Sequence, residues 1–147
     1  MADDARNVWD DVPDWGGVGA RRLARAPAAS LGASLWELQP GGSQFTYHFH
    51  HGSDELLVVL RGTPTVRLHD GERTLGEGDV LSLPRGPEGG HQVRNDSDEV
   101  ARVLIVSSNA DPDVAEYPDF GKVGFVAGGS SWEFHRHADA VEHAGPE

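Results

Sequence analysis

The fold of this 147-residue chain is decided by the stretch Gly42-Ser43-Gln44-Phe45-Thr46-Tyr47-His48-Phe49-His50-His51-Gly52-Ser53-Asp54-Glu55. His48 and His50 are one residue apart, and Glu55 follows them after a short glycine-containing segment. Side chains alternate between the two faces of a strand, so the two histidines should project from the same face. Gly52 and Ser53 allow the chain to reverse, so that Glu55 can reach that face from the neighbouring strand. We therefore expect a metal site built on strands.

The donor types restrict the metal. Imidazole nitrogens with one carboxylate oxygen suit Fe, Mn, Ni, Cu or Zn better than Ca or Mg. The chain has no cysteine, which excludes a structural zinc site made of thiolates. A fourth candidate ligand, His91, lies in a separate segment that is punctuated by glycine and proline.

The spacing of these residues resembles the two sequence motifs of the cupin superfamily. The first motif combines Gly, His-x-His, Glu and Gly at fixed distances, which are matched by Gly42, His48, His50, Glu55 and Gly62. The second motif is matched, with four residues instead of two before its histidine, by Gly78, Pro84, Gly86, His91 and Asn95. With the strand pattern, the resemblance extends from about residue 31 to residue 107. Residues 117–124 resemble the tail of small single-domain bacterial cupins.

The resemblance implies a divalent transition metal held by His48, His50, Glu55 and His91. It also implies that Glu55 can dissociate from the metal and act as a catalytic base. Asn95 is expected to cap a turn.

The fold that the resemblance implies is all-β, a jelly-roll barrel, and 19 glycines and nine prolines supply the turns that such a barrel needs. We divide the chain into an N-terminal arm (1–29), the barrel (30–108) and a C-terminal extension (109–147) that packs on the barrel or on a partner chain. Strands are expected at 31–38, 45–50, 55–61, 65–69, 73–75, 80–83, 90–94 and 101–107. The strand 55–61 is apolar on both faces, which predicts burial on both sides.

The alternation of side chains along the strands also predicts a substrate pocket. Gln44 and Thr46 share the face of the paired histidines. Leu57 shares the face of Glu55, and Val93 shares the face of His91. We expect Gln44, Thr46, Leu57 and Val93 to line the cavity beside the metal.

Other polar residues near the motif have alternative interpretations. His51 is interpreted as a loop histidine near the mouth of the barrel, with a substitute ligand or a proton shuttle as the alternative. Asp54 fits a shorter motif spacing, but the six-residue gap before Gly62 favours Glu55 as the ligand. Arg61 and Arg85 are interpreted as solvated, although either could meet an anionic substrate.

The C-terminal extension contains three further histidines, His135, His137 and His143. The first two repeat the His-x-His spacing, but no strand-turn-strand pattern surrounds them in the sequence. We therefore interpret this cluster as structural or solvated.

Charge and composition exclude several classes of partner. The formal net charge of −12 disfavours nucleic acid and anionic membranes, which bind basic surfaces. The acidic N-terminus lacks the apolar segment of a secretory signal, so a cytoplasmic location is the default. We expect the protein to form a homodimer and to bind a small molecule.

Three functions are compatible with these residues. The preferred one is a metal-dependent enzyme acting on a small oxygenated molecule, either a dioxygenase or an isomerase, epimerase or lyase. The alternative is a non-catalytic cupin that binds or senses a metal or a small ligand. A structural or storage role is disfavoured, because storage does not require an intact set of ligands.

We predict that His48→Ala, His50→Ala, Glu55→Ala and His91→Ala each lower the metal content of the purified protein sharply. His135→Ala is the control and should retain its metal. Elemental analysis of the five variants checks this prediction, and an equal loss in His135→Ala would contradict the assignment of the ligands.

Overall fold

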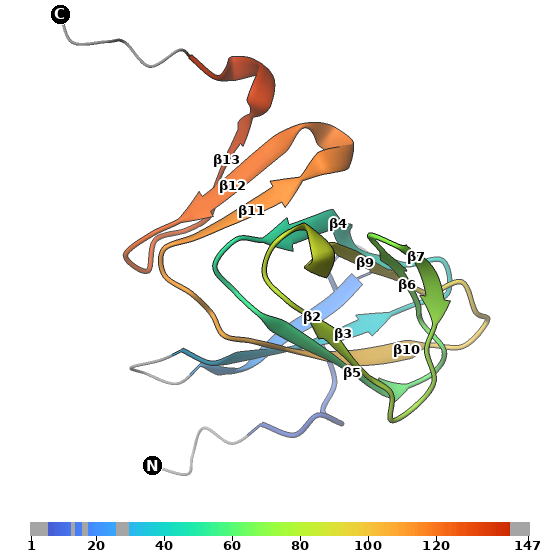
Figure 1. Ribbon diagram of the computed structural model, residues 1–147. Coiled ribbons are helices and arrows are strands. Elements are labelled where there is room, and N and C mark those ends of the chain that lie inside the picture. The colour runs from blue at the N-terminus through green and yellow to red at the C-terminus, as the bar shows by residue number, and fades with distance from the viewer. Residues whose placement is uncertain (1–5, 13, 16–17, 26–29, 142–147) are drawn as a thin grey trace, which may run out of the picture.

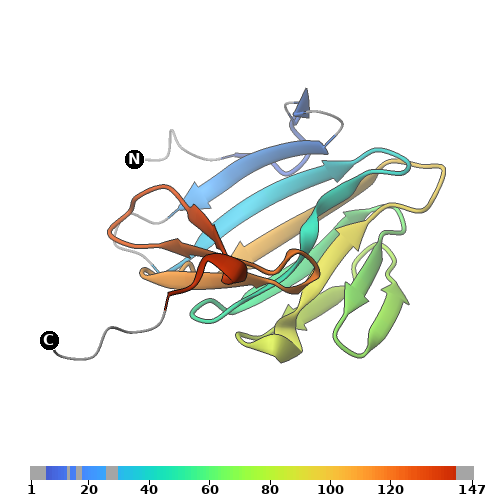
Figure 2. The same cartoon turned by 90° about the horizontal axis from the view of Figure 1, so that it is seen from above.

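The structure is a computed structural model that describes residues 6–12, 14–15, 18–25 and 30–141. Two antiparallel sheets face each other and enclose the hydrophobic core, as Figures 1 and 2 show. This confirms the predicted all-β, jelly-roll fold. Among the described residues the helical segments are short 3-10 turns, η2 (Pro87–Gly89), η3 (Pro118–Phe120) and η4 (His137–Asp139). The described segments contain no helix that is long and apolar enough to span a membrane.

The first sheet has six strands in the order β1-β2-β3-β10-β5-β8. Their bounds are β1 (Asp14–Trp15), β2 (Val18–Arg25), β3 (Gly32–Leu38), β10 (Ala101–Ser107), β5 (Glu55–Arg61) and β8 (Val80–Leu83). The bounds of β5, β8 and β10 agree with the expected strands. Residues that we assigned to an N-terminal arm form β2, which pairs with β3 and widens the sheet.

The second sheet has seven strands in the order β13-β12-β11-β4-β9-β6-β7. Their bounds are β13 (Glu133–Arg136), β12 (Lys122–Val126), β11 (Asp113–Tyr117), β4 (Ser43–His50), β9 (His91–Arg94), β6 (Thr65–Leu68) and β7 (Gly71–Thr74). The three strands β11, β12 and β13 belong to the C-terminal extension, and β11 pairs with β4. The extension therefore continues the sheet of the barrel beyond β4 (Figure 1).

The core lies between the two sheets. β5 and β10 contribute inward side chains from the first sheet, and β6 and β9 contribute them from the second. Five of these side chains are exposed by 1% or less: Leu57, Val59, Val103, Val66 and Val93. Their apolar surface is removed from water, which is the main force that holds the sheets together.

The expectation that β5 is buried on both faces is wrong. Leu57 and Val59 face the core, but the side chain of Leu56 is 44% exposed on the opposite face. Among the described residues no second layer covers this outer face of β5 completely. The apolar sequence of β5 alone could not show whether that face is covered.

Two motif residues that are not candidate ligands have structural roles. Gly62 has a φ of 79°, and a Cβ atom there would lie 2.8 Å from the carbonyl oxygen of Val100. Asn95 is fully buried, and its amide donates hydrogen bonds to the carbonyl oxygens of Leu38 (2.9 Å) and Glu99 (2.7 Å). Both residues hold the turns at the end of the barrel.

We predict that Leu57→Ala lowers the free energy of unfolding by about 2–5 kcal/mol, because it leaves a cavity in the core. Leu56→Ala is the matched control, since it removes the same atoms from a partly exposed site, and it should cost about 1 kcal/mol or less. Urea denaturation of the two variants measures the difference. Similar losses would contradict the assignment of the two faces of β5.

Candidate metal centre

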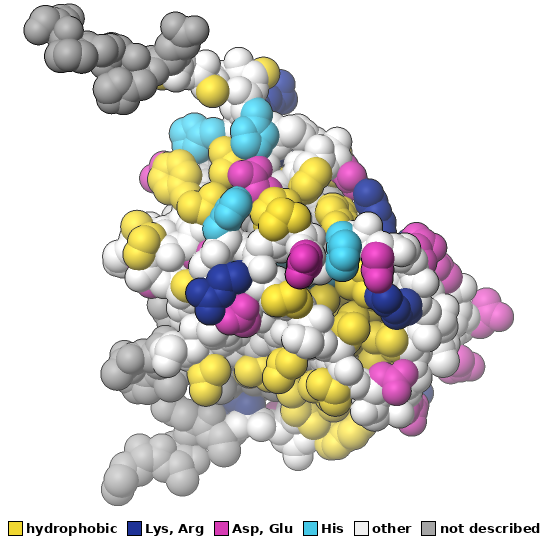
Figure 3. All heavy atoms as spheres, in the orientation of Figure 1, with side chains coloured by type: hydrophobic (Ala, Val, Ile, Leu, Met, Phe, Trp, Pro, Cys, Tyr) yellow, Lys and Arg dark blue, Asp and Glu magenta, His cyan; other side chains and the backbone are white. Residues whose placement is uncertain are grey.

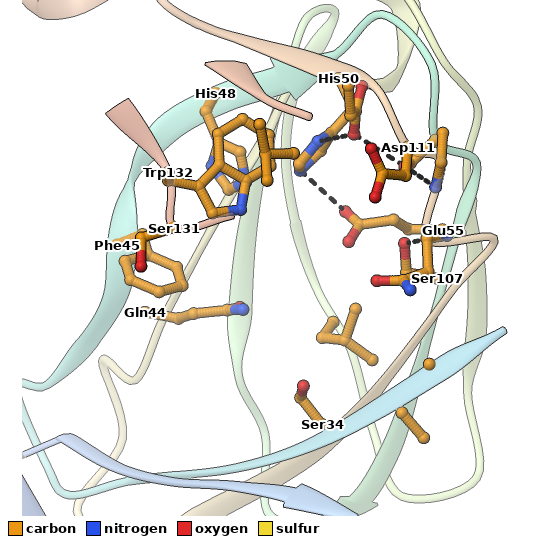
Figure 4. Close-up of a pocket in the computed structure, with 18 of the residues that line it drawn as sticks. Ser34, Gln44, Phe45, His48, His50, Glu55, Ser107, Asp111, Ser131 and Trp132 are labelled. Atoms are coloured by element: carbon orange, nitrogen blue, oxygen red, sulfur yellow. Dashed lines mark hydrogen bonds and ion pairs between the residues drawn. The ribbon is translucent and has the colours of Figure 1, made fainter. Parts of the chain in front are cut away.

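Four side chains predicted as ligands meet between the two sheets. β4 carries His48 and His50, β5 carries Glu55, and β9 carries His91 directly opposite His48 in the strand register. His48, His50 and Glu55 each offer a ligand atom, and these three atoms lie within 4.8 Å of one another (Figure 4). His91 lies beside them, with its Nε2 3.5 Å from Oε2 of Glu55. The described residues therefore form a group that could hold a metal ion.

The three imidazoles are oriented by hydrogen bonds at their Nδ1 atoms. Nδ1 of His48 donates to the carbonyl oxygen of Thr46 (2.9 Å), and Nδ1 of His91 donates to that of Gly89 (2.9 Å). A carbonyl oxygen can only accept, so the proton of each neutral ring lies on Nδ1 and the lone pair on Nε2. Metal-binding histidines are commonly fixed in this way. The donor set and its orientation thus fit a transition metal.

His50 is held by a carboxylate from the C-terminal extension. Its Nδ1 lies 2.8 Å from Oδ2 of Asp113, which also accepts a hydrogen bond from the Ser53 hydroxyl (2.7 Å). Oδ1 of Asp113 accepts a hydrogen bond from the backbone N–H of Gly52 (2.8 Å). Burial raises the pKa of Asp113, but the hydrogen bonds from His50 and Ser53 outweigh it and lower the pKa. Asp113 therefore stays ionised and fixes both His50 and the turn that leads to Glu55.

Burial keeps two of the imidazoles neutral. Burial, together with the neighbouring His91 and His50, lowers the pKa of His48 to about 3. Burial also lowers the pKa of His91. Burial lowers the pKa of His50 as well, but the bond to Asp113 and the charge of Glu55 outweigh it and raise the pKa. Neutral imidazole is the form that binds a metal.

The candidate ligands line a cavity of about 690 Å³. Its polar end contains the three histidines and Glu55, and five aromatic rings form part of the remaining wall. These rings belong to Trp36, Phe45, Tyr117, Trp132 and Phe134. A cavity of this size accommodates a small organic molecule.

Of the four predicted pocket residues, Gln44 lines this cavity, and its buried Oε1 has no hydrogen-bond partner among the described residues. Thr46 does not line the cavity, because the chain bulges at Phe45, where φ is 40° and the pairing of β4 with β9 shifts. The bulge turns Phe45 into the cavity and breaks the alternation of faces. Leu57 and Val93 do not line it either, since they point into the core below it.

The neighbouring polar residues lie outside the centre. Asp54 and Arg85 form an exposed ion pair with a 2.8 Å contact. Arg61 is exposed at the end of β5. His51 is half exposed, with its Nε2 3.4 Å from Glu116.

Histidine side chains gather over β11–β13 on the face drawn in Figure 3. His135 and His137 are each more than half exposed. His137 pairs with Glu116 (2.7 Å), and His135 stacks on Phe125. Neither lines the cavity of the metal centre, and His143 lies outside the described residues.

Local sequence patterns did not predict the site residues Asp113, Tyr117 and Trp132, which the extension brings to the centre. The ring of Tyr117 stacks on His48 with centroids 5.3 Å apart, and burial followed by the charge of Glu55 raises the pKa of its phenol. These contacts join residues more than 60 positions apart, as in the pair His50 and Asp113. Only a signal of long-range strand pairing would have found them.

The low pKa of His48 should make the stability of the metal-free protein depend on pH. The unfolded chain binds a proton at His48 near its ordinary pKa of 6.5, whereas the folded state resists protonation until about pH 3. Stability should therefore be full above about pH 6.5 and should fall as the pH drops below it. We expect the Tm of EDTA-treated protein to fall between about pH 7.5 and about pH 5.5, and to fall less in His48→Gln. Calorimetry measures this, and equal decreases would contradict a buried, neutral His48.

Comparisons with known proteins identify the family. The sequence model of the cupin domain matches residues 34–107, which is half of the chain. A comparison with curated proteins finds no match. Among solved structures, the chain is similar to a sugar phosphate isomerase of the cupin superfamily from Silicibacter pomeroyi, with 28% identity, a TM-score of 0.77, and coverage of 87% of this chain and 82% of that one.

Two further structures are similar over a shorter part of the chain. The polyketide cyclase RemF from Streptomyces resistomycificus has 27% identity and a TM-score of 0.54, with coverage of 63% of this chain and 65% of that one. A cupin 2 conserved barrel domain protein from Salinispora arenicola has 27% identity and a TM-score of 0.55, with coverage of 68% and 82%. With the two-motif centre between its sheets and the matched domain, this chain belongs to the cupin family.

Proposed function

We propose that this protein is a metal-dependent cupin enzyme that abstracts a carbon-bound proton from a small oxygenated organic molecule. The proton then returns to the molecule in an isomerase or epimerase, or a leaving group departs in a lyase. One observation carries the proposal. Three oriented histidines and Glu55 meet at the polar end of a cavity of about 690 Å³ that five aromatic rings help to line. His48, His50, His91 and Glu55 would hold the metal.

A metal in such a site polarises a carbonyl or hydroxyl group of the substrate, which makes an adjacent C–H bond more acidic. The residues of the chain supply the rest. The hydrogen bonds at Nδ1 keep the rings of His48 and His91 in place, and Asp113 does the same for His50. Aromatic side chains restrict water and orient the substrate.

Glu55 is the proposed base. Its carboxylate is 12% exposed and lies 3.5 Å from Nε2 of His91 and 3.9 Å from Nε2 of His50. A carboxylate has two oxygens, so one could bind the metal while the other accepts a proton from the substrate. Gln44 would donate or accept a hydrogen bond from the opposite wall, where its buried Oε1 lacks a partner among the described residues.

The similar structures favour proton transfer over oxidation. The sugar phosphate isomerase and the polyketide cyclase are each at least 27% identical to this chain. Isomerisation and cyclisation need no oxidant, whereas a dioxygenase consumes dioxygen. A non-catalytic cupin that binds a small ligand is the second candidate, and the unpartnered Gln44 would serve such a ligand equally well.

The test is hydrogen exchange in D2O. The metal-loaded protein should exchange a carbon-bound hydrogen for deuterium in a member of a panel of hydroxy ketones, aldose and ketose phosphates and 2-keto acids, followed by NMR. Glu55→Gln should lower the rate per bound metal by at least ~100-fold, because the amide cannot accept the proton. Glu133→Gln, at a side chain that is 65% exposed, is the control.

The outcomes separate the candidates. Consumption of dioxygen with the same panel would favour a dioxygenase. Tight binding of a panel member without exchange would favour the binding protein. An unchanged rate per metal in Glu55→Gln would contradict the role of Glu55 as the base.

A further inference from the structure

The cavity has one wall that does not come from the cupin barrel. The turn between β12 and β13 and the start of β13 contribute Gly129, Ser130, Ser131, Trp132 and Phe134 to its lining. The cupin domain match ends at residue 107, so this wall belongs to the C-terminal extension. It is therefore a feature that the motifs of the barrel do not determine.

Trp132 is placed directly over the candidate metal centre. Its ring lies 5.8 Å from that of His50, at an interplanar angle of 71°. Figure 4 shows the indole beside His50, with Phe45 and Gln44 on the same side of the cavity. The side chain is still 36% exposed, so part of its surface is free to contact a ligand. An aromatic surface of this kind contacts the ring or the apolar body of a substrate.

Asp111 holds the turn that carries Trp132. Its two carboxylate oxygens accept hydrogen bonds from the backbone N–H groups of Gly128 (2.7 Å) and Gly129 (2.8 Å). Both glycines have positive φ values, 63° and 72°, which residues with a side chain rarely adopt. Asp111 lies two residues before Asp113, so one short segment fixes both the turn and His50.

The aromatic rings also depend on close packing over β12. A Cβ atom at Gly124 would lie 2.8 Å from the ring of Phe134 and 3.3 Å from that of Trp132. The two rings stack with their centroids 6.4 Å apart. The hairpin β12–β13 therefore presents the two rings as one surface.

We propose that Trp132 determines substrate specificity by packing against a ring or apolar group of the substrate, and that Asp111 is the residue that positions it. The substrate class is then a molecule with metal-binding oxygens at one end and an apolar or cyclic body at the other. The inference that the substrate binds the metal through oxygens rests on the proposed function. The inference that Trp132 contacts an apolar body does not depend on it.

Lactate and phenyllactate test the proposal, because they share the 2-hydroxy acid group and differ in the ring. Their dissociation constants are measured by calorimetry on the Co²⁺-loaded and the metal-free protein. The wild-type protein should bind phenyllactate about tenfold more tightly than lactate. Trp132→Ala should lose this preference with unchanged Co²⁺ content, and Trp132→Phe should keep most of it.

Two controls complete the design. Phe125→Ala removes a 40% exposed ring of the same hairpin that stacks on His135 and does not line the cavity, so the preference should remain.

Asp111→Ala should weaken the preference and accelerate amide hydrogen exchange in residues 127–132, and Asp111→Asn, which keeps one acceptor oxygen, should do so less. Asp79→Ala removes a similar bond to the N–H of Gly76 (2.8 Å) in a distant turn and should change neither.

The outcomes are decisive for each claim. If the wild-type protein and Trp132→Ala prefer phenyllactate over lactate equally, the role of Trp132 is overturned. The same holds if the wild-type protein shows no preference in either the Co²⁺-loaded or the metal-free form. Unchanged exchange in Asp111→Ala would overturn the role of Asp111. A protein that takes up no Co²⁺ would refute the proposed function, while titration of the metal-free protein would still decide the contact with the ring.

Discussion

The hydrogen bond between His50 and Asp113 connects the parts of this protein on which its site depends. It joins β4 of the barrel to the first residue of β11, where the C-terminal extension enters the sheet. The same carboxylate also holds Ser53 and Gly52, which lie in the turn between the histidine strand and Glu55. One buried anion thereby fixes the orientation of a candidate ligand, the approach of a second one and the attachment of the extension. A charge that is buried in this way is stable only with several donors around it.

The remaining two histidines form their hydrogen bonds with the backbone. Carbonyl groups of Thr46 and Gly89 accept the protons at Nδ1 of His48 and His91. These hydrogen bonds therefore depend on the course of β4 and on the turn before β9, while the ring of Tyr117 stacks on that of His48. The site combines two rings fixed by the barrel with one ring fixed by the extension. This division explains how the metal centre of the barrel can be combined with a cavity wall from the C-terminal extension.

The parts of this architecture that follow from local sequence could be predicted. The regular spacing of the motifs predicted His48, His50 and Glu55 as ligands. Their ligand atoms lie within 4.8 Å of one another. Turn residues and apolar runs also located β5, β8 and β10. The bulge at Phe45 could not be predicted, since a φ of 40° at a phenylalanine in a strand has no local signature, and it moved Thr46 out of the cavity. The contributions of Asp113 and Trp132 depend on strand pairing across distant positions, which alternation along one strand does not encode.

The central claim is that three histidines and Glu55 hold one metal between the two sheets. Anomalous diffraction from crystals of the protein loaded with Co²⁺ or Zn²⁺ tests it most directly. We predict one strong peak at about 2.0–2.2 Å from Nε2 of His48, His50 and His91 and from a carboxylate oxygen of Glu55. A peak at the exposed histidines of the extension, or a cavity without a peak at full metal loading, would contradict it.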